Sequence, residues 1–154
     1  MPSENGANTG QIIEIKGVVI DAVFPDRLPE ILHAVQIEVP RPDGTSSTLI
    51  AEVQQHLGDD RVRAVAMDST DGLARGADVI DTGGPITVPV GDSTLGRIWN
   101  VIGQPVDDKP ASAETERWSI HREPPAFRDQ KPSVEVFETG IKVIDLIAPY
   151  IKGG

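Results

Sequence analysis

The sequence has 154 residues, room for one or two domains, and it contains no cysteine, so disulfides and thiolate metal sites are excluded. Hydrophobic residues make up 38% of it and aromatic residues only 4%, so a core has to be built from aliphatic side chains. The formal net charge of −10 disfavours binding to nucleic acid, because an acidic surface repels the phosphate backbone.

Residues 1–9 are small and polar, and they lack the basic start and apolar run of a signal peptide and the Arg-rich pattern of a transit peptide. We expect a disordered tail there. No stretch reaches the roughly 18 apolar residues that a membrane-spanning helix needs. The lack of a targeting signal favours a bacterial or organelle-encoded protein.

From residue 10 to residue 90 the pattern is that of a β-domain. Ile13, Ile15, Val19 and Val23 recur at even spacing, interrupted at Gly17, where a bulge or sharp coil would suit. Further strands are expected at 34–39, 48–57, 61–67, 79–80 and 86–88, with turns at 42–44 and 58–60. Such short strands predict a small antiparallel barrel or sandwich, and closure into a barrel is preferred because it leaves no exposed edges.

Residues 91–154 have a different character, with glycine and proline throughout the first part. One helix is predicted over residues 141–148, capped by Thr139 and ended by Pro149. Its apolar side chains lie at helical spacing and cover a wide face, so we expect the helix to be well buried. The segment has too little regular structure to close a core alone, and we interpret it as the truncated start of a second domain.

No catalytic, cofactor-binding or metal-binding residue is predicted. No glycine is followed by lysine, so the phosphate-binding loop is absent, and so are the dinucleotide and nucleophile-elbow motifs. His33, His56 and His121 are too far apart for metal-ligand spacing and are assigned ordinary structural or surface roles. The acidic pairs Asp59–Asp60 and Asp107–Asp108 stand among turn-forming residues and are interpreted as solvated turns.

Three segments remain that composition does not explain: 67–76 (MDSTDGLARG), 88–105 (VPVGDSTLGRIWNVIGQP) and 138–154 (ETGIKVIDLIAPYIKGG). In the first, residues 68–71 can satisfy their own backbone amides. In this order, the three segments resemble the beta subunits of rotary F-type ATP synthases. The resemblance covers nearly all of residues 10–154, with departures at Ala74, where valine is common, and at residues 107–110, which lack a glycine usual before Pro110.

The resemblance implies a mainly β fold: a disordered tail (1–9), an N-terminal β-barrel (10–90) that forms part of a hexamer crown, and the incomplete start of a RecA-like α/β nucleotide-binding domain (91–154), ending before the phosphate-binding loop. It implies ATP synthesis from ADP and phosphate, driven by a transmembrane ion gradient, by the full-length subunit with Mg-ATP or ADP bound. The 154-residue chain alone is expected to be inactive and to hold no cofactor.

The implied partners are alpha subunits, which alternate with beta in the hexamer, and the gamma subunit of the central stalk. The complex would sit on a membrane ion-conducting sector, at the cytoplasmic side of the bacterial inner membrane or its organellar equivalent. The alpha subunit shares the Thr-Gly-Ile-Lys element, but residues 67–76 and the LIAPYIKGG stretch favour beta.

A free-standing barrel similar to OB-like binding modules is the rival interpretation. It would need exposed aromatic side chains or a basic groove for its ligands, and this acidic, aromatic-poor sequence offers neither.

Overall fold

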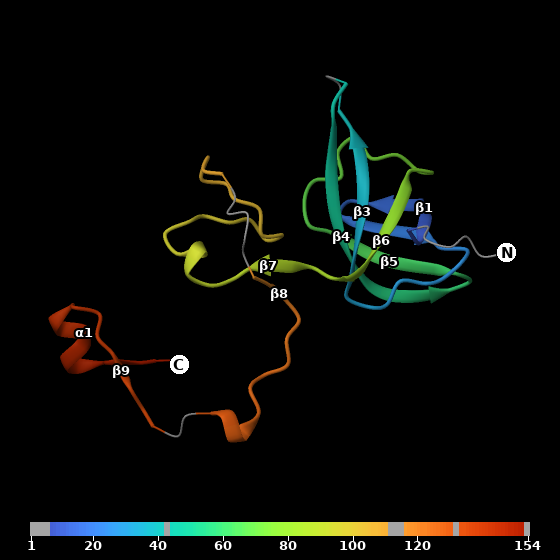
Figure 1. Cartoon of the computed structure of the whole chain (residues 1–154). Helices are drawn as coiled ribbons and strands as arrows, with labels where there is room; N and C mark the ends of the chain where they lie inside the picture. The colour runs from blue at the N-terminus through green and yellow to red at the C-terminus, as the bar shows by residue number, and fades with distance from the viewer. Residues whose placement is uncertain (1–6, 42–43, 111–115, 131–132, 153–154) are drawn as a thin grey trace. The chain divides into compact units, whose positions relative to one another are not determined.

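The computed structural model describes residues 7–41, 44–110, 116–130 and 133–152. The chain divides into two compact units, Met1–Arg122 and Glu123–Gly154. The first unit contains a barrel, coloured blue to green in Figure 1. Its six strands are β1 (Thr9–Lys16), β2 (Val19–Val23), β3 (His33–Pro40), β4 (Ser46–Gly58), β5 (Arg61–Ala66) and β6 (Asp78–Pro85).

The barrel is closed, as predicted. Its strand order is β1-β2-β5-β4-β3-β6, every neighbouring pair is antiparallel, and β6 returns to pair with β1. Closure matters physically because each strand then uses its backbone donors and acceptors on both sides. The predicted turn at 58–60 joins β4 to β5, and of the predicted turn at 42–44 only Gly44 lies within the described residues.

Aliphatic side chains from all six strands fill the interior of the barrel. β3 and β5 show the alternation that the sequence predicted: Val35, Ile37 and Val39 on one strand and Val62, Ala64 and Ala66 on the other are buried. The rest of the core cluster comprises Ile12, Ile20, Ala22, Phe24, Leu49, Ala51, Val53 and Val79. Phe24 is its one aromatic member, in keeping with the low aromatic content of the chain.

The first stretch of alternating apolar residues forms two strands, β1 and β2, which are separated at Gly17, where the sequence predicted a bulge or sharp coil. Gly17, at φ 60°, begins a tight two-residue turn between β1 and β2, and the bulge lies between Ile12 and Glu14 instead. The turn reverses the chain, so even spacing across it does not define one face. Ile12 and Ile20 face the core at 2% and 1% exposure, whereas Ile13 and Ile15 are only half-buried.

Residues after β6 continue outside the barrel but within the first unit. The strand predicted at 86–88 appears as β7 (Thr87–Pro89), and it pairs with β8 (Arg117–Ser119) rather than with a barrel strand. Between them lie a 3-10 helix, Asp92–Thr94, and an isolated bridge between Trp99 and Pro105. Ile86, just before β7, is buried at 4% exposure.

The second unit contains little regular structure: a 3-10 helix (Phe127–Asp129), the paired strands β9 (Val136–Phe137) and β10 (Tyr150–Ile151), and helix α1 (Lys142–Ile147). The predicted helix is thus present. The predicted cap was wrong: the N-cap position is Ile141, which has no side-chain capping bond, and the Thr139 hydroxyl accepts a hydrogen bond from the Ile141 amide at 3.1 Å. Asp145 accepts hydrogen bonds from the Thr139 hydroxyl and from the Thr139 and Gly140 amides, so it ties the helix to the residues before it.

The expected burial of this helix was wrong. Val143 is 65% exposed and Leu146 77% exposed. Among the described residues of this unit no side chain is buried, so the unit itself leaves the apolar face of the helix uncovered. No helix in the described part of the chain is long and apolar enough to cross a membrane.

Candidate functional site

All three histidines make hydrogen bonds inside the protein. The His33 ring nitrogen Nδ1 lies 3.1 Å from Asp81, and His56 Nε2 lies 2.7 Å from the carbonyl oxygen of Pro29. His121 Nε2 lies 2.6 Å from a carboxylate oxygen of Glu52. Each therefore holds two parts of the chain together, which agrees with a structural role.

The two acidic pairs differ from each other. Asp59 and Asp60 form the β4–β5 turn with φ angles of 50° and 57°, as their residue type allows. Asp107, however, is not a solvated turn residue: its side chain is 9% exposed and accepts two hydrogen bonds from Arg97, at 2.6 and 3.0 Å. These bonds hold the pKa of Asp107 well below its usual range. The Trp99–Pro105 bridge folds the chain back and brings the pair together.

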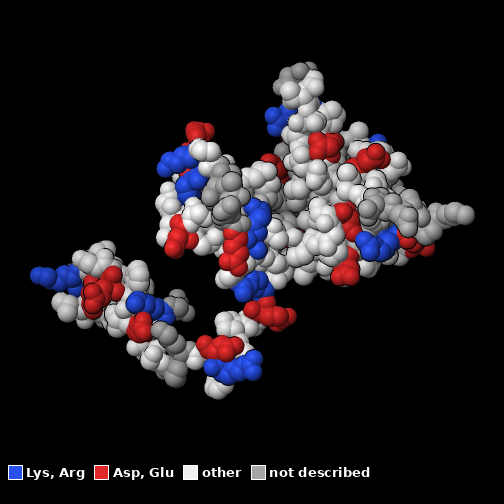
Figure 2. Space-filling view, in the orientation of Figure 1, with Lys and Arg blue, Asp and Glu red and all other residues white. Residues whose placement is uncertain are grey.

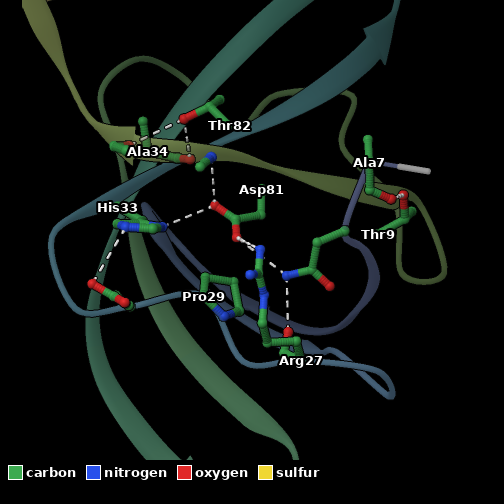
Figure 3. Close-up of polar contacts among 12 residues, drawn as sticks. Ala7, Thr9, Arg27, Pro29, His33, Ala34, Asp81 and Thr82 are labelled. Carbon is green, nitrogen blue, oxygen red and sulfur yellow. Dashed lines mark hydrogen bonds and ion pairs between the residues drawn. The ribbon is translucent and has the colours of Figure 1, made fainter. Parts of the chain in front are cut away.

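A denser polar cluster surrounds Asp81, near the end of β6 (Figure 3). The Asp81 side chain is 1% exposed and accepts hydrogen bonds from the Gly83 amide at 2.9 Å, from Asn8 at 3.1 Å and from His33. The Arg27 guanidinium lies 3.9 Å from Asp81 Oδ2, the oxygen that also accepts the bond from Asn8. Burial alone raises the pKa of Asp81, but the donors outweigh it and hold the pKa below its ordinary value.

The Asp81 cluster borders a hollow of about 280 Å³ lined by Arg27, Leu28, Glu30, His33, Asp81 and Gly83. Because a carboxylate that already accepts several hydrogen bonds has little capacity left, Asp81 is poorly suited to bind a metal or to take a proton from a substrate. The cluster instead ties residue 8, the start of β3 and the end of β6 together. Beside it, the Thr82 hydroxyl donates to the Ala34 carbonyl at 2.8 Å.

The loop after β5, residues 67–76, satisfies its own amides as predicted. The Ser69 amide donates to the Asp68 carboxylate at 2.7 Å, and the Asp71 amide donates to the Ser69 hydroxyl at 3.2 Å. Thr70 donates to the carbonyl of Gly17 at 2.8 Å, so the loop is attached to the β1–β2 turn. Together with the end of β3 and the start of β4, the loop borders a polar hollow of about 670 Å³.

Sequence reasoning missed three buried carboxylates, Asp21, Glu52 and Asp81, which are 5–7% exposed. Each follows a buried or half-buried strand residue, and an acid inside an apolar stretch is the one signal that could have drawn attention to them. Their partners depend on strand register. Asp21 stands directly opposite Arg63 in the β2–β5 ladder and accepts two bonds from it, both at 2.8 Å.

No described residues resemble a nucleotide or metal site. Groups of three or more potential metal-ligating side chains are not found within the described ranges. The sequence has no Gly-Lys-Ser/Thr loop to hold phosphates. On the face seen in Figure 2, acidic and basic side chains lie interspersed and form no continuous basic surface.

One comparison with known families bears on this barrel. Residues 12–83 match the family model described as the ATP synthase alpha/beta family, beta-barrel domain. The match begins within β1 and ends within β6, so it coincides with the closed barrel of the structure. The 67–76 loop lies within it, and so does the Asp81 cluster apart from Asn8. Over residues 12–83 the chain is therefore similar to the beta-barrel domain of the ATP synthase alpha/beta family.

Proposed function

We propose that this chain is the N-terminal part of the catalytic beta subunit of an F-type ATP synthase, an enzyme that makes ATP from ADP and phosphate with the energy of a transmembrane ion gradient. In this proposal the barrel joins neighbouring subunits in the crown of the hexamer. The residues after it lead into the nucleotide-binding domain.

The observation that carries the choice of beta over alpha is the loop of residues 67–76, MDSTDGLARG. This loop lies within the family match, and its residue pattern resembles that of beta chains. The stretch LIAPYIKGG, whose helical part is α1, favours the same choice. The match to the ATP synthase alpha/beta family also weighs against the free-standing OB-like module.

The proposed partners are alpha subunits, alternating with beta in the hexamer, and the gamma subunit of the central stalk. The complex would associate with a membrane ion-conducting sector at the cytoplasmic face of a bacterial inner membrane. Mg-ATP and ADP would be held by the full-length subunit. We assign none of the residues described here to nucleotide binding, since they offer no phosphate loop.

A pair of chimeras tests the choice of subunit. Residues 10–122 replace the matching segment of a bacterial beta subunit in one chimera and of the alpha subunit in the other. We expect the beta chimera to assemble into a complex that makes ATP in inverted membrane vesicles and the alpha chimera to fail. The reverse result would assign the chain to alpha, and failure of both would reject the proposed interchangeability of this barrel.

A further inference from the structure

Glu52 is a buried carboxylate whose side chain points away from the barrel interior. It lies on β4 between Ala51 and Val53, both of which are 0% exposed core residues. Because side chains alternate along a strand, Glu52 projects to the outer surface of the barrel. It is nevertheless only 5% exposed, so other parts of the chain must cover it.

The covering segment comes from the residues after the barrel. His121 Nε2 lies 2.6 Å from one carboxylate oxygen of Glu52, and Gln54 donates to the other. A charged acceptor with both oxygens occupied can tolerate burial, whereas loss of a donor would leave a desolvated oxygen. The contact joins residues that are 69 positions apart in the sequence.

The surroundings of this contact belong to the same surface. Ala34, which pairs with Glu52 in the β3–β4 ladder, lines a hollow of about 310 Å³ together with Ile50, Ile86, Ile102 and Arg117. The Ile120 amide donates to the carbonyl of Ile86 at 3.0 Å. Thus the chain on either side of β7 and β8 lies against the outside of the barrel near Glu52.

The contact between Glu52 and His121 lies at the end of the first unit, whose last residue is Arg122. His121 binds Glu52, and the guanidinium carbon of Arg122 lies 3.6 Å from the centre of the Trp118 ring. The Ser119 hydroxyl accepts a bond from the His121 amide at 3.0 Å and so shapes the short turn that aims the imidazole. His121 thereby joins the end of this unit to β4, while Arg122 packs on β8 within the same segment.

We propose that Glu52 and His121 form an anchor that holds residues 119–122 on the outer face of the barrel and so fixes the point at which the chain leaves the barrel unit. His121 positions residues 119–122 through its hydrogen bond to Glu52. This anchor requires only contacts within the first unit, and it holds whether the barrel belongs to an alpha or a beta chain.

Amide hydrogen exchange of the full chain, read residue by residue by NMR, tests the anchor. The Ile120 amide is the probe because its bond to Ile86 closes only while residues 119–122 lie in place. We expect His121→Ala to accelerate exchange at Ile120 about tenfold, which corresponds to ~1.4 kcal/mol. The amide of Ala51, in the middle of β4, reports whether the barrel remains folded.

Three further variants separate the anchor from a general loss of packing. His56→Ala removes a histidine on β4 whose ring is bound to Pro29, and it leaves Ile120 exchange unchanged. Glu52→Gln keeps an acceptor oxygen and has a smaller effect than His121→Ala. In a Glu52→Leu background, His121→Ala has no further effect, because its partner is already gone. Unchanged Ile120 exchange in His121→Ala, or an undiminished effect in the Glu52→Leu background, would overturn the anchor.

Discussion

At the residue scale, the barrel contains a few buried carboxylates whose oxygens accept hydrogen bonds from neighbouring groups. Asp21 is bound by Arg63, Glu52 by His121 and Gln54, and Asp81 by a backbone amide and two side chains. A buried charge of this kind is tolerated because its partners replace water. Removal of one member leaves the others desolvated, so these positions are sensitive to substitutions of similar size.

Asp81→Asn tests this sensitivity. The amide of asparagine presents N–H groups to donors that bind a carboxylate, so we expect the free energy of unfolding near pH 7 to fall by about 1–3 kcal/mol. Urea denaturation followed by circular dichroism measures it. Asp78→Asn, on the exposed side of the same strand, is the matched control and should change stability by less than about 0.5 kcal/mol.

The difference in unfolding free energy between the wild-type protein and Asp81→Asn depends on pH in a defined direction. The pKa of folded Asp81 lies below its ordinary value of 3.8. A lowered pKa contributes stability that is complete above the unfolded pKa and is lost as the pH falls toward the folded one. The stability gap between the wild-type protein and Asp81→Asn therefore narrows when the pH is lowered from about 5 to about 3. A gap that widens in acid would contradict the assigned donors.

At the element scale, strand positions were predictable and strand partners were not. Residues 34–39 and 61–67 alternate without interruption, and they became β3 and β5 almost to the residue. Gly17 interrupted the first pattern, and the sequence does not say whether such a glycine bends one strand or ends it. The structure places a turn there, and the buried isoleucines of the two strands are Ile12 and Ile20.

The segment outside the barrel depends on one close approach at Gly103. A Cβ atom at this position would lie 2.5 Å from Pro89 Cδ and 3.0 Å from Val88 Cα, so the loop touches β7 directly. Gly96, at φ +66°, has a similar backbone conformation to Gly103 at φ +72°, but nothing lies within 4 Å of its Cβ position. The two glycines share a left-handed backbone conformation, which would strain a residue with a Cβ atom, and they differ in contact.

Substitution by alanine at each of the two positions separates the effect of the backbone conformation from the effect of the contact with β7. Gly96→Ala should cost about 1–2 kcal/mol from the left-handed backbone alone, and Gly103→Ala should cost a further ~1–3 kcal/mol from the collision. Trp99 and Trp118, the two tryptophans of the sequence, lie in this segment, so fluorescence during urea denaturation reports on it. Equal effects of the two substitutions would show that the loop does not contact β7.

At the scale of the whole molecule, the two units differ in how they are stabilised. The barrel closes around a continuous aliphatic core, whereas the described residues of the second unit include no buried side chain. The helix at Lys142–Ile147 was predictable from its spacing, but its environment was not, because burial depends on chain that packs against it from elsewhere. Periodicity predicts which face is apolar, and only tertiary contacts decide whether that face is covered.

The proposed division of labour, with a structural barrel and nucleotide chemistry elsewhere in the subunit, predicts that this 154-residue chain does not bind Mg-ATP tightly. Phosphate binding needs converging backbone amides and a lysine, and no glycine here is followed by lysine. The net charge of −10 further opposes an anionic ligand. Equilibrium dialysis against labelled Mg-ATP should therefore show no saturation below about 1 mM, the range of weak association.

A phosphate-loop ATPase dialysed in parallel provides the positive control for that measurement. If this chain instead saturated at about 1 μM, a nucleotide site would have to exist among its residues, since such affinity corresponds to ~8 kcal/mol of binding free energy. Amide hydrogen exchange measured with and without Mg-ATP would then locate the site, because amides at the site become protected when the nucleotide binds. Protection in the hollow bordered by residues 67–76 would make the barrel itself the nucleotide-binding element and would remove the basis for assigning it a purely structural role.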